Sequence, residues 1–174
     1  TRVRKRLRRR VNFANMPPIL NKKPLKATAI MSSISFVGTF YNKSPFVPVV
    51  MASLKAQREL PPEVEYIFID DGSTDDTLAQ LRTHSQGLPN VTIISQANQG
   101  PAVATNVGIF KAKNHFLKII DGDDLLHPDL TWVLIKALTD TEAASVYAHG
   151  GTLDDVQIYR SFDWAPVLAR CTPV

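Results

Sequence analysis

Two stretches of the chain decide the fold: VEYIFIDDGSTD at residues 64–75 and FLKIIDGDD at residues 116–124. In each, a short run rich in β-branched and aromatic residues is followed at once by acidic sequence that contains glycine. Such a run is typical of a buried strand that leaves a sheet at its carboxyl end. Open α/β sheets bind ligands at that edge. The two stretches therefore predict acidic side chains from two strands at one ligand-binding edge.

The rest of the chain alternates between strand and helix patterns. We expect strands at residues 34–40, 64–69, 91–94, 116–120 and 145–148. Helices are expected after Ser44-Pro45 and residue 75, and from Pro101 and His127-Pro128. The apolar residues expected on the helix faces that pack inward are Phe46, Val49, Val50, Leu54, Leu78, Leu81, Val103, Val107, Phe110, Leu130, Val133, Leu134 and Leu138. This order predicts a Rossmann-like α/β domain with a mainly parallel sheet and helices on both faces.

The composition is that of an ordinary globular protein. Of the 174 residues, 44% are hydrophobic and 21% are charged, and no apolar run approaches the roughly 20 residues of a membrane helix. The single cysteine, Cys171, excludes an internal disulfide and any multi-cysteine zinc site. Neither a Gly-x-x-x-x-Gly-Lys loop nor a Gly-x-Gly-x-x-Gly motif is present, so the ordinary P-loop and dinucleotide sites lack support.

Charge is distributed unevenly along the chain. Residues 1–26 carry ten Lys or Arg and no acid, whereas the remainder carries ten bases and sixteen acids. We interpret residues 1–28 as a basic arm or linker, and residues 29–174 as the folded domain, because blocks of like charge resist folding. Basic arms also bind anionic surfaces. We expect a cytoplasmic protein for which the inner face of the membrane is a candidate partner and nucleic acid is not.

The carboxyl edge of the predicted sheet collects the candidate binding groups. The first strand delivers Thr39 and Tyr41, the second Asp70 and Asp71, and the fourth Asp121, Asp123 and Asp124. An aromatic ring can stack on a nucleobase, and a carboxylate can accept hydrogen bonds from a base or a ribose. Mg²⁺ and similar hard cations prefer oxygen ligands and usually share them with substrate phosphates. These groups together predict a nucleoside diphosphate compound bound through a metal ion.

A simpler interpretation of the acidic clusters stays open. Asp-Gly and Gly-Ser are common turn signals, and Asp side chains cap helices without any catalytic role. We expect Asp75 and Asp76 to be such caps. The turn at residues 121–124 is harder to explain in this way, because three acids in four residues repel one another unless a cation neutralises them. Between the acids, we expect Gly122 to let the backbone approach a ligand closely.

Several motifs, in unbroken order, resemble the nucleotide-sugar-binding half of a family-two inverting glycosyltransferase with the GT-A fold. They are ISFVGTFYN at residues 34–42, DDGSTD at 70–75, NQGPA at 98–102, NVG at 106–108 and DGDD at 121–124. Pro128-Asp129 also stands where the family often has Pro-Asp. The similarity covers roughly residues 30–150. Four or more motifs in order make it much more specific than a single Asp-x-Asp would be.

The resemblance implies transfer of a sugar from a nucleoside diphosphate donor, most simply UDP-linked, to an acceptor hydroxyl with inversion. The cofactor implied is Mn²⁺ or Mg²⁺. The site residues implied are Thr39 and Tyr41 for the nucleoside pocket, Asp70 and Asp71 for the base, Asp121 for the ribose or diphosphate, and Asp123 with Asp121 for the metal. A role in polysaccharide biosynthesis follows, with a saccharide, a lipid or a protein as acceptor. The general base is expected beyond Val174, so we expect the GT-A domain to be truncated at its C-terminus.

Two departures from the family pattern concern the site. Thr39 stands where many members have proline, and Thr105 stands where arginine usually precedes the asparagine of the Asn-x-Gly motif. Two other function classes stay open on the sequence. One is a nucleotide- and metal-binding fragment without turnover, and the other is a metal-dependent nucleotidyltransferase.

Overall fold

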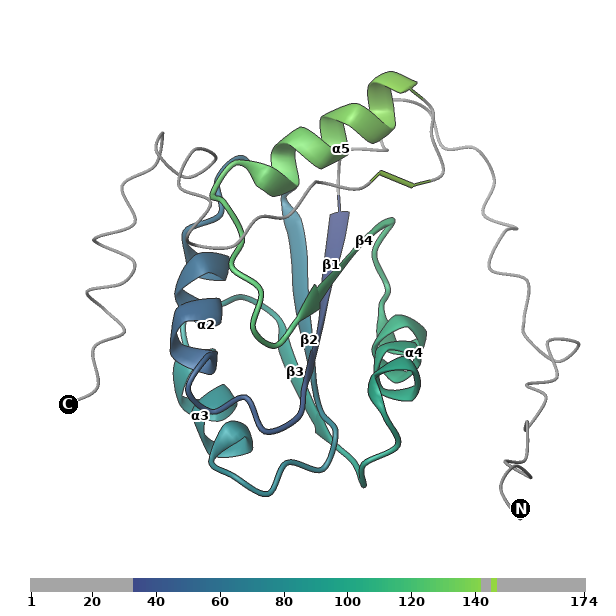
Figure 1. The fold of residues 1–174 in the computed structure, drawn as a ribbon. Helices are drawn as coiled ribbons and strands as arrows, with labels where there is room; N and C mark the ends of the chain where they lie inside the picture. Colours follow the sequence, from purple (N-terminus) through teal and green to yellow (C-terminus); the bar gives the residue numbers. More distant parts are fainter. Residues whose placement is uncertain (1–32, 142–144, 147–174) are drawn as a thin grey trace, which may run out of the picture.

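The computed structural model describes residues 33–141 and 145–146 (Figure 1). The elements in chain order are β1 (Ser33–Phe40), α2 (Val47–Lys55), β2 (Glu63–Asp70), α3 (Thr77–His84), β3 (Val91–Ser95), α4 (Pro101–Lys111), β4 (Phe116–Asp121) and α5 (Leu130–Thr141). Strands and helices alternate as the sequence predicts. The boundary between an arm at 1–28 and a domain at 29–174 lies outside the described part, so this division stays a prediction.

The described strands form a four-stranded sheet in the order β3-β2-β1-β4. All neighbouring pairs are parallel, with Phe40 opposite Asp70 and Thr39 opposite Asp121. The carboxyl ends of β1, β2 and β4 are therefore level with one another. The fifth strand expected at residues 145–148 is not seen where it can be checked: Ser145 and Val146 are described outside any strand, and residues 147–148 lie outside the described part.

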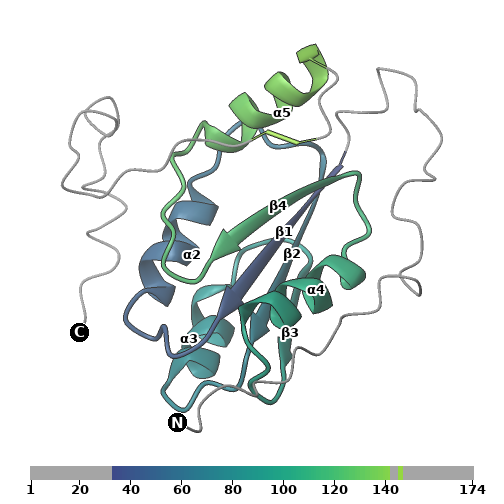
Figure 2. The ribbon, with the colours of Figure 1, turned by 45° about the vertical axis from the view of Figure 1, so that its right-hand side comes forward.

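Helices cover both faces of the sheet, as predicted. Figures 1 and 2 show α2 and α3 on one face and α4 on the other. Alternate residues of β1 point to the two faces, because side chains of a strand alternate in direction. Phe36 thus belongs to a large core that includes Tyr66 and residues of α2, while Val37 joins a small cluster with Ala104 of α4. The Phe36 and Tyr66 rings stack with their centroids 4.9 Å apart.

The face that α4 turns to the sheet differs from the predicted one. Val103 and Phe110 were expected inward but are 39% and 60% exposed, whereas Ala104 and Gly108 are buried. A Cβ atom on Gly108 would lie 2.3 Å from Cγ1 of Val37, so the helix packs too close to β1 for a larger residue. Val107 packs against the same small cluster, as predicted. Hydrophobic periodicity missed Ala104 and Gly108 because these residues are small.

Helix α2 begins later than the sequence predicts. Ser44-Pro45 was expected to open the helix, but Phe46 is the N-cap residue and Pro48 lies in the first turn. Residues 43–46 instead form a turn in which the carbonyl of Lys43 accepts hydrogen bonds from the N–H groups of Phe46 and Val47. Phe46 is 44% exposed, since it precedes the helix and does not share its buried face.

Helix α5 also differs in part from its prediction. Val133 was expected to pack inward but is 55% exposed, whereas Thr131 and Ile135 are buried. The inward face therefore includes Ile135, which joins the large core, and Leu130, which packs against that core as predicted. Among the helices of residues 33–141, none has the length and apolar character required to cross a membrane.

Candidate functional site

The loop after β1 is bound to the loop after β2. Asn42 has a left-handed backbone conformation with φ 51°, which asparagine tolerates better than most residues. Its side-chain oxygen accepts hydrogen bonds from the N–H of Thr74 at 2.8 Å and from the Thr74 hydroxyl at 3.3 Å. Its own N–H donates to the hydroxyl of Ser73 at 3.0 Å. These contacts hold the two loops side by side at the carboxyl edge of the sheet.

Asp70 is buried at the end of β2, with 2% of its surface exposed. One carboxylate oxygen accepts a hydrogen bond from the N–H of Ser73 at 3.3 Å, and the other from the Ser95 hydroxyl at 2.9 Å. A buried carboxylate is tolerated when such donors replace water. Asp70 thereby connects its own loop to the end of β3.

Asp71 is equally buried and has three donors. Its carboxylate accepts from the side-chain amide of Gln96 at 2.7 Å, the N–H of Gln99 at 3.0 Å and the N–H of Gly100 at 2.8 Å. It therefore organises the loop from β3 to α4. Gln96 was not expected at the site, because no local pattern links it to a residue 25 positions earlier. The assignment of Asp70 and Asp71 to a nucleobase stays a prediction.

The two candidate residues from β1 differ in exposure. Thr39 is 8% exposed and lies in β1 opposite Asp121 of β4. Tyr41 follows the strand and is 47% exposed, which is unusual for so large an aromatic residue. The ring is thus accessible at the edge where the loops after β1 and β2 meet.

The acidic turn, residues 121–124, follows β4 directly. The N–H of Asp124 donates to the carbonyl of Asp121 at 3.0 Å, and the N–H of Asp121 donates to the Asp124 carboxylate at 3.3 Å. Gly122 is buried, and a Cβ atom there would lie 2.7 Å from Cδ1 of Phe40 and 2.9 Å from the Thr39 carbonyl oxygen. The backbone of the turn therefore packs closely against β1, and its close approach to a ligand stays a prediction.

The acidic turn has an excess of negative charge. Burial raises the pKa of Asp121, and the nearby Asp124 and Asp123 carboxylates raise it further, against a smaller opposing effect of Lys43. The Lys43 ammonium forms an ion pair with Asp123. Within β4 itself, burial lowers the pKa of Lys118, an effect that Asp124 opposes. A further cation would relieve the repulsion that the carboxylates impose on one another.

The acidic turn suits a hard divalent cation, although it is not a complete metal site. Carboxylate oxygens are the ligands that Mg²⁺ and Mn²⁺ prefer. Within residues 33–141, no group of three or more His, Cys, Asp or Glu side chains is gathered as a preformed metal cage. This agrees with the usual way of holding Mg²⁺, through one or two carboxylates together with phosphate and water oxygens.

The simpler interpretation of the acidic residues holds at the start of α3. Asp75 accepts hydrogen bonds from the N–H of Thr77 at 3.0 Å and from the N–H of Ser44 at 3.2 Å. Burial alone would raise the pKa of Asp75, but a hydrogen bond from the Thr77 hydroxyl, together with these two N–H groups, outweighs burial and lowers the pKa. Asp76 occupies the N-cap position without a side-chain capping bond. The Asp75 side chain therefore caps α3, and the prediction that the Asp76 side chain also caps it is wrong.

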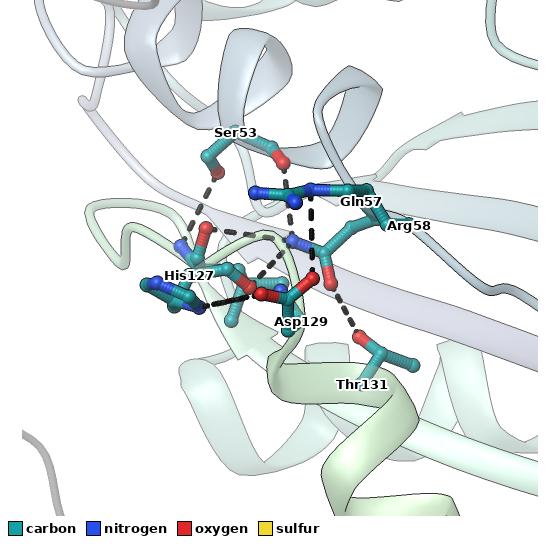
Figure 3. A network of polar contacts seen from close by, with 7 residues as sticks. Ser53, Gln57, Arg58, His127, Asp129 and Thr131 are labelled. Atoms are coloured by element: carbon teal, nitrogen blue, oxygen red, sulfur yellow. Dashed lines mark hydrogen bonds and ion pairs between the residues drawn. The ribbon is translucent and has the colours of Figure 1, made fainter. Parts of the chain in front are cut away.

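A polar network anchors the chain that follows the acidic turn (Figure 3). The side-chain amide of Gln57 donates to the carbonyl oxygens of His127 at 3.0 Å, Ser53 at 3.2 Å and Leu126 at 3.4 Å. Its oxygen accepts from the Thr131 hydroxyl at 2.6 Å. The Ser53 hydroxyl accepts from the N–H of Leu126. The end of α2 therefore holds the segment between the acidic turn and α5, a role that the sequence did not reveal.

The fold and the edge together define an α/β domain with a parallel sheet and an acidic ligand-binding edge. The chain belongs to glycosyl transferase family 2, whose family model matches residues 35–163. This confirms the family resemblance of the motifs and, with the solved structures below, the GT-A type of fold. The matched region contains every candidate residue from Thr39 to Asp123.

Several known proteins are similar to parts of this chain. Chondroitin synthase of Escherichia coli is 29% identical over 161 residues, which is 89% of this chain and 23% of that protein. The uncharacterised glycosyltransferase YibD of Escherichia coli K12 is 32% identical over 110 residues, 63% of this chain and 31% of that protein. The chain thus spans about a quarter to a third of the length of these relatives.

Solved structures agree with the fold. The structure of S. aureus TarS in complex with UDP-GlcNAc is 27% identical with a TM-score of 0.56, over 63% of this chain and 31% of that chain. The Pyrobaculum calidifontis mannosyltransferase PcManGT, solved with GDP-Man and Mn²⁺, is 22% identical with the same TM-score, over 65% of this chain and 33% of that chain. The second similarity concerns the fold alone.

Proposed function

We propose that this domain binds a nucleoside diphosphate sugar, most simply a UDP-sugar, as the donor for glycosyl transfer to an acceptor hydroxyl with inversion. One observation carries the proposal: the strand register brings the loops after β1 and β2 and the acidic turn to a single sheet edge. The TarS complex with UDP-GlcNAc supports a UDP-linked donor, since that chain is similar in sequence and fold. The relatives that make chondroitin support polysaccharide biosynthesis as the setting.

The nucleoside end of the donor is assigned to the loops after β1 and β2. The exposed Tyr41 ring can stack on the base, and Thr39 borders the same edge. Asp70 and Asp71 are proposed to shape the base pocket. Each carboxylate already accepts hydrogen bonds from the protein, so these acids hold loops in place as well as offering oxygens to the base.

The diphosphate end is assigned to the acidic turn. Asp123, with Asp121 beside it, would hold Mn²⁺ or Mg²⁺ against the phosphate oxygens. When bound, that cation supplies positive charge that stabilises the departing nucleoside diphosphate. Support comes from the excess negative charge of the turn: burial raises the pKa of Asp121, and the neighbouring Asp124 and Asp123 carboxylates raise it further. The residues of this chain then orient the donor and keep its phosphates at the sheet edge.

The proposal is tested by the metal dependence of nucleotide binding. Calorimetry should show that UDP binds the full chain more tightly with Mn²⁺ than with EDTA. Asp123→Asn should abolish this difference, because the variant loses the carboxylate that anchors the ion. Asp140→Asn is the matched control: it removes the same charge from another Lys–Asp pair, the one with Lys136 in α5. If UDP bound the unmodified chain equally well with Mn²⁺ and with EDTA, the metal assignment would be contradicted.

We further propose that the basic residues 1–26 contact an anionic membrane surface on the cytoplasmic side. The basis is their charge: ten Lys or Arg precede a remainder that carries a net charge of −6. Such segments are attracted to anionic lipid by about 1 kcal/mol per basic residue near the surface.

A further inference from the structure

Lys43 has a fixed backbone and a side chain that lies over the acidic turn. Its N–H donates to the Thr77 hydroxyl at 2.8 Å, and its carbonyl accepts from Phe46 and Val47. Its Cγ atom would lie 3.1 Å from a Cβ atom added at Gly122, so the aliphatic part of the side chain passes close to the turn. The backbone contacts fix where the side chain begins, while the side chain as a whole is 32% exposed.

The Lys43 ammonium has two partners. It forms an ion pair with Asp123, a residue 80 positions later, and lies 5.5 Å from the centre of the Phe46 ring. Asp123 is 41% exposed. Exposed ion pairs contribute little to stability, and contacts between an exposed ammonium and an aromatic ring contribute similarly little. The ammonium is therefore held weakly enough to exchange partners.

Counting formal charges shows why an exchange would be favourable. The three carboxylates of the acidic turn and the Lys43 ammonium together leave a net charge of −2. A divalent cation bound at Asp123 brings that sum to zero and takes the oxygen that Lys43 was using. The diphosphate of the donor then adds negative charge beside a displaced ammonium, whose flexible stem and three donors suit phosphate oxygens.

We propose that Lys43 is an exchangeable counter-cation of the donor site. It neutralises Asp123 when no donor is bound and moves to the diphosphate when a divalent cation takes Asp123. The inference rests on the proposed donor site and adds a specific residue to it. Lys43 is thus a competitor of the metal when the nucleotide is absent, and a ligand of the nucleotide when the metal is present.

The two roles predict effects of opposite sign. In Lys43→Gln, Mn²⁺ alone should bind about two- to fivefold more tightly, the range expected when a competing exposed ion pair is removed. UDP at saturating Mn²⁺ should bind about fivefold or more weakly, because a charge-assisted hydrogen bond to phosphate is lost. A side chain that only supported the loop would weaken both ligands when replaced.

The experiment measures the two affinities separately on the full chain. The affinity for Mn²⁺ without nucleotide is obtained from the concentration of free Mn²⁺, measured by electron paramagnetic resonance. The affinity for UDP is measured by calorimetry at saturating Mn²⁺. Lys43→Gln and Lys43→Met remove the ammonium, while Lys43→Arg keeps a cation and should stay near the unmodified values. Lys136→Gln is the matched control, because it breaks the Lys136–Asp140 pair at 2.8 Å in α5. Circular dichroism and thermal unfolding confirm that each variant is folded.

Opposite shifts in both neutral variants, absent in Lys136→Gln, support the inference. If the unmodified chain binds UDP with Mn²⁺ but Lys43→Gln and Lys43→Met weaken both ligands, or change neither, the role of Lys43 is overturned and the donor site stands. If the unmodified chain binds no UDP at any Mn²⁺ concentration, the donor site is overturned and the role of Lys43 with it.

Discussion

Single glycines set how closely the parts of this domain approach one another. Gly108 lets α4 lie against Val37 of β1, and Gly122 lets the acidic turn lie against Phe40 and the Thr39 carbonyl. Gly72 has φ 73°, and a Cβ atom there would lie 2.6 Å from the backbone nitrogen of Asn98. At each position the absent side chain makes room for another segment of the domain, and at Gly72 and Gly122 that segment borders the candidate site.

Gly108→Ala should destabilise the protein although alanine is the better helix former. The added Cβ atom would lie 2.3 Å from Cγ1 of Val37, in a helix and strand that cannot easily move apart. Overpacking of this kind typically costs about 1–3 kcal/mol. The higher helix propensity of alanine, a gain of about 1 kcal/mol, offsets only part of that cost. Urea unfolding followed by circular dichroism would measure the loss.

A double variant shows whether the loss comes from that contact. Val37→Ala removes the atom that the new methyl group would strike, although it also leaves a small cavity. The loss in Gly108→Ala with Val37→Ala should therefore be smaller than the sum of the two single losses. Additive losses would mean that the close approach of α4 to β1 does not limit the residue at position 108.

At the scale of elements, loops far apart in the sequence are joined by side chains that accept or donate several hydrogen bonds at once. Asp71 binds the loop from β3 to α4, Asn42 binds the loop after β2, and Gln57 binds the segment that leads into α5. The helices and strands supply the frame, and these three side chains fix the loops on it. Geometry at the candidate site should therefore respond to changes outside it.

Gln57→Leu should loosen the segment that follows the acidic turn. The carbonyl oxygens of Leu126 and His127 would lose a donor, and a buried group left without a partner costs about 1–3 kcal/mol. Hydrogen exchange followed by mass spectrometry should show faster exchange in peptides covering residues 122–131. Thr131→Val removes only the bond to the Gln57 oxygen and should have a smaller effect. Unchanged exchange in Gln57→Leu would show that other contacts are sufficient.

At the scale of the whole molecule, the acidic domain and the basic segment are expected to act independently. Every residue assigned to the donor lies from Thr39 onward, within the region that the family model matches. The basic residues lie at 1–26 and carry the charge that makes the whole chain positive. Donor binding and surface binding should therefore be separable by truncation.

Deleting residues 1–26 should leave the affinity for UDP with Mn²⁺ within about twofold of the full chain. Binding to vesicles that contain phosphatidylserine should fall strongly, and in the full chain it should weaken as salt rises, because exposed charges are screened. Calorimetry and vesicle sedimentation measure the two properties, with neutral phosphatidylcholine vesicles as the control. A large loss of UDP affinity on truncation would show that the segment takes part in donor binding.

The sequence by itself determined the order of elements, the parallel sheet and the acidic edge. Short stretches of sequence carry these features: runs of β-branched and aromatic residues in β2 and β4, Pro at the start of α4, and acids directly after β2 and β4. Once strands and helices alternate, the connections require a parallel sheet, and a parallel sheet brings strand ends to one edge. The motifs at that edge were enough to identify the family.

Only the tertiary structure decided what the edge residues contact. The fully buried residues of α4 are small, so the sequence alone does not reveal that they pack against β1. The pairs of Asp71 with Gln96, Lys43 with Asp123, and Gln57 with Leu126 join positions 25 to 80 residues apart. No local pattern encodes such pairs, because they arise from how the strands are ordered and how closely the layers pack. Hydrophobic spacing and motifs report neighbours along the chain, whereas these contacts depend on neighbours in space.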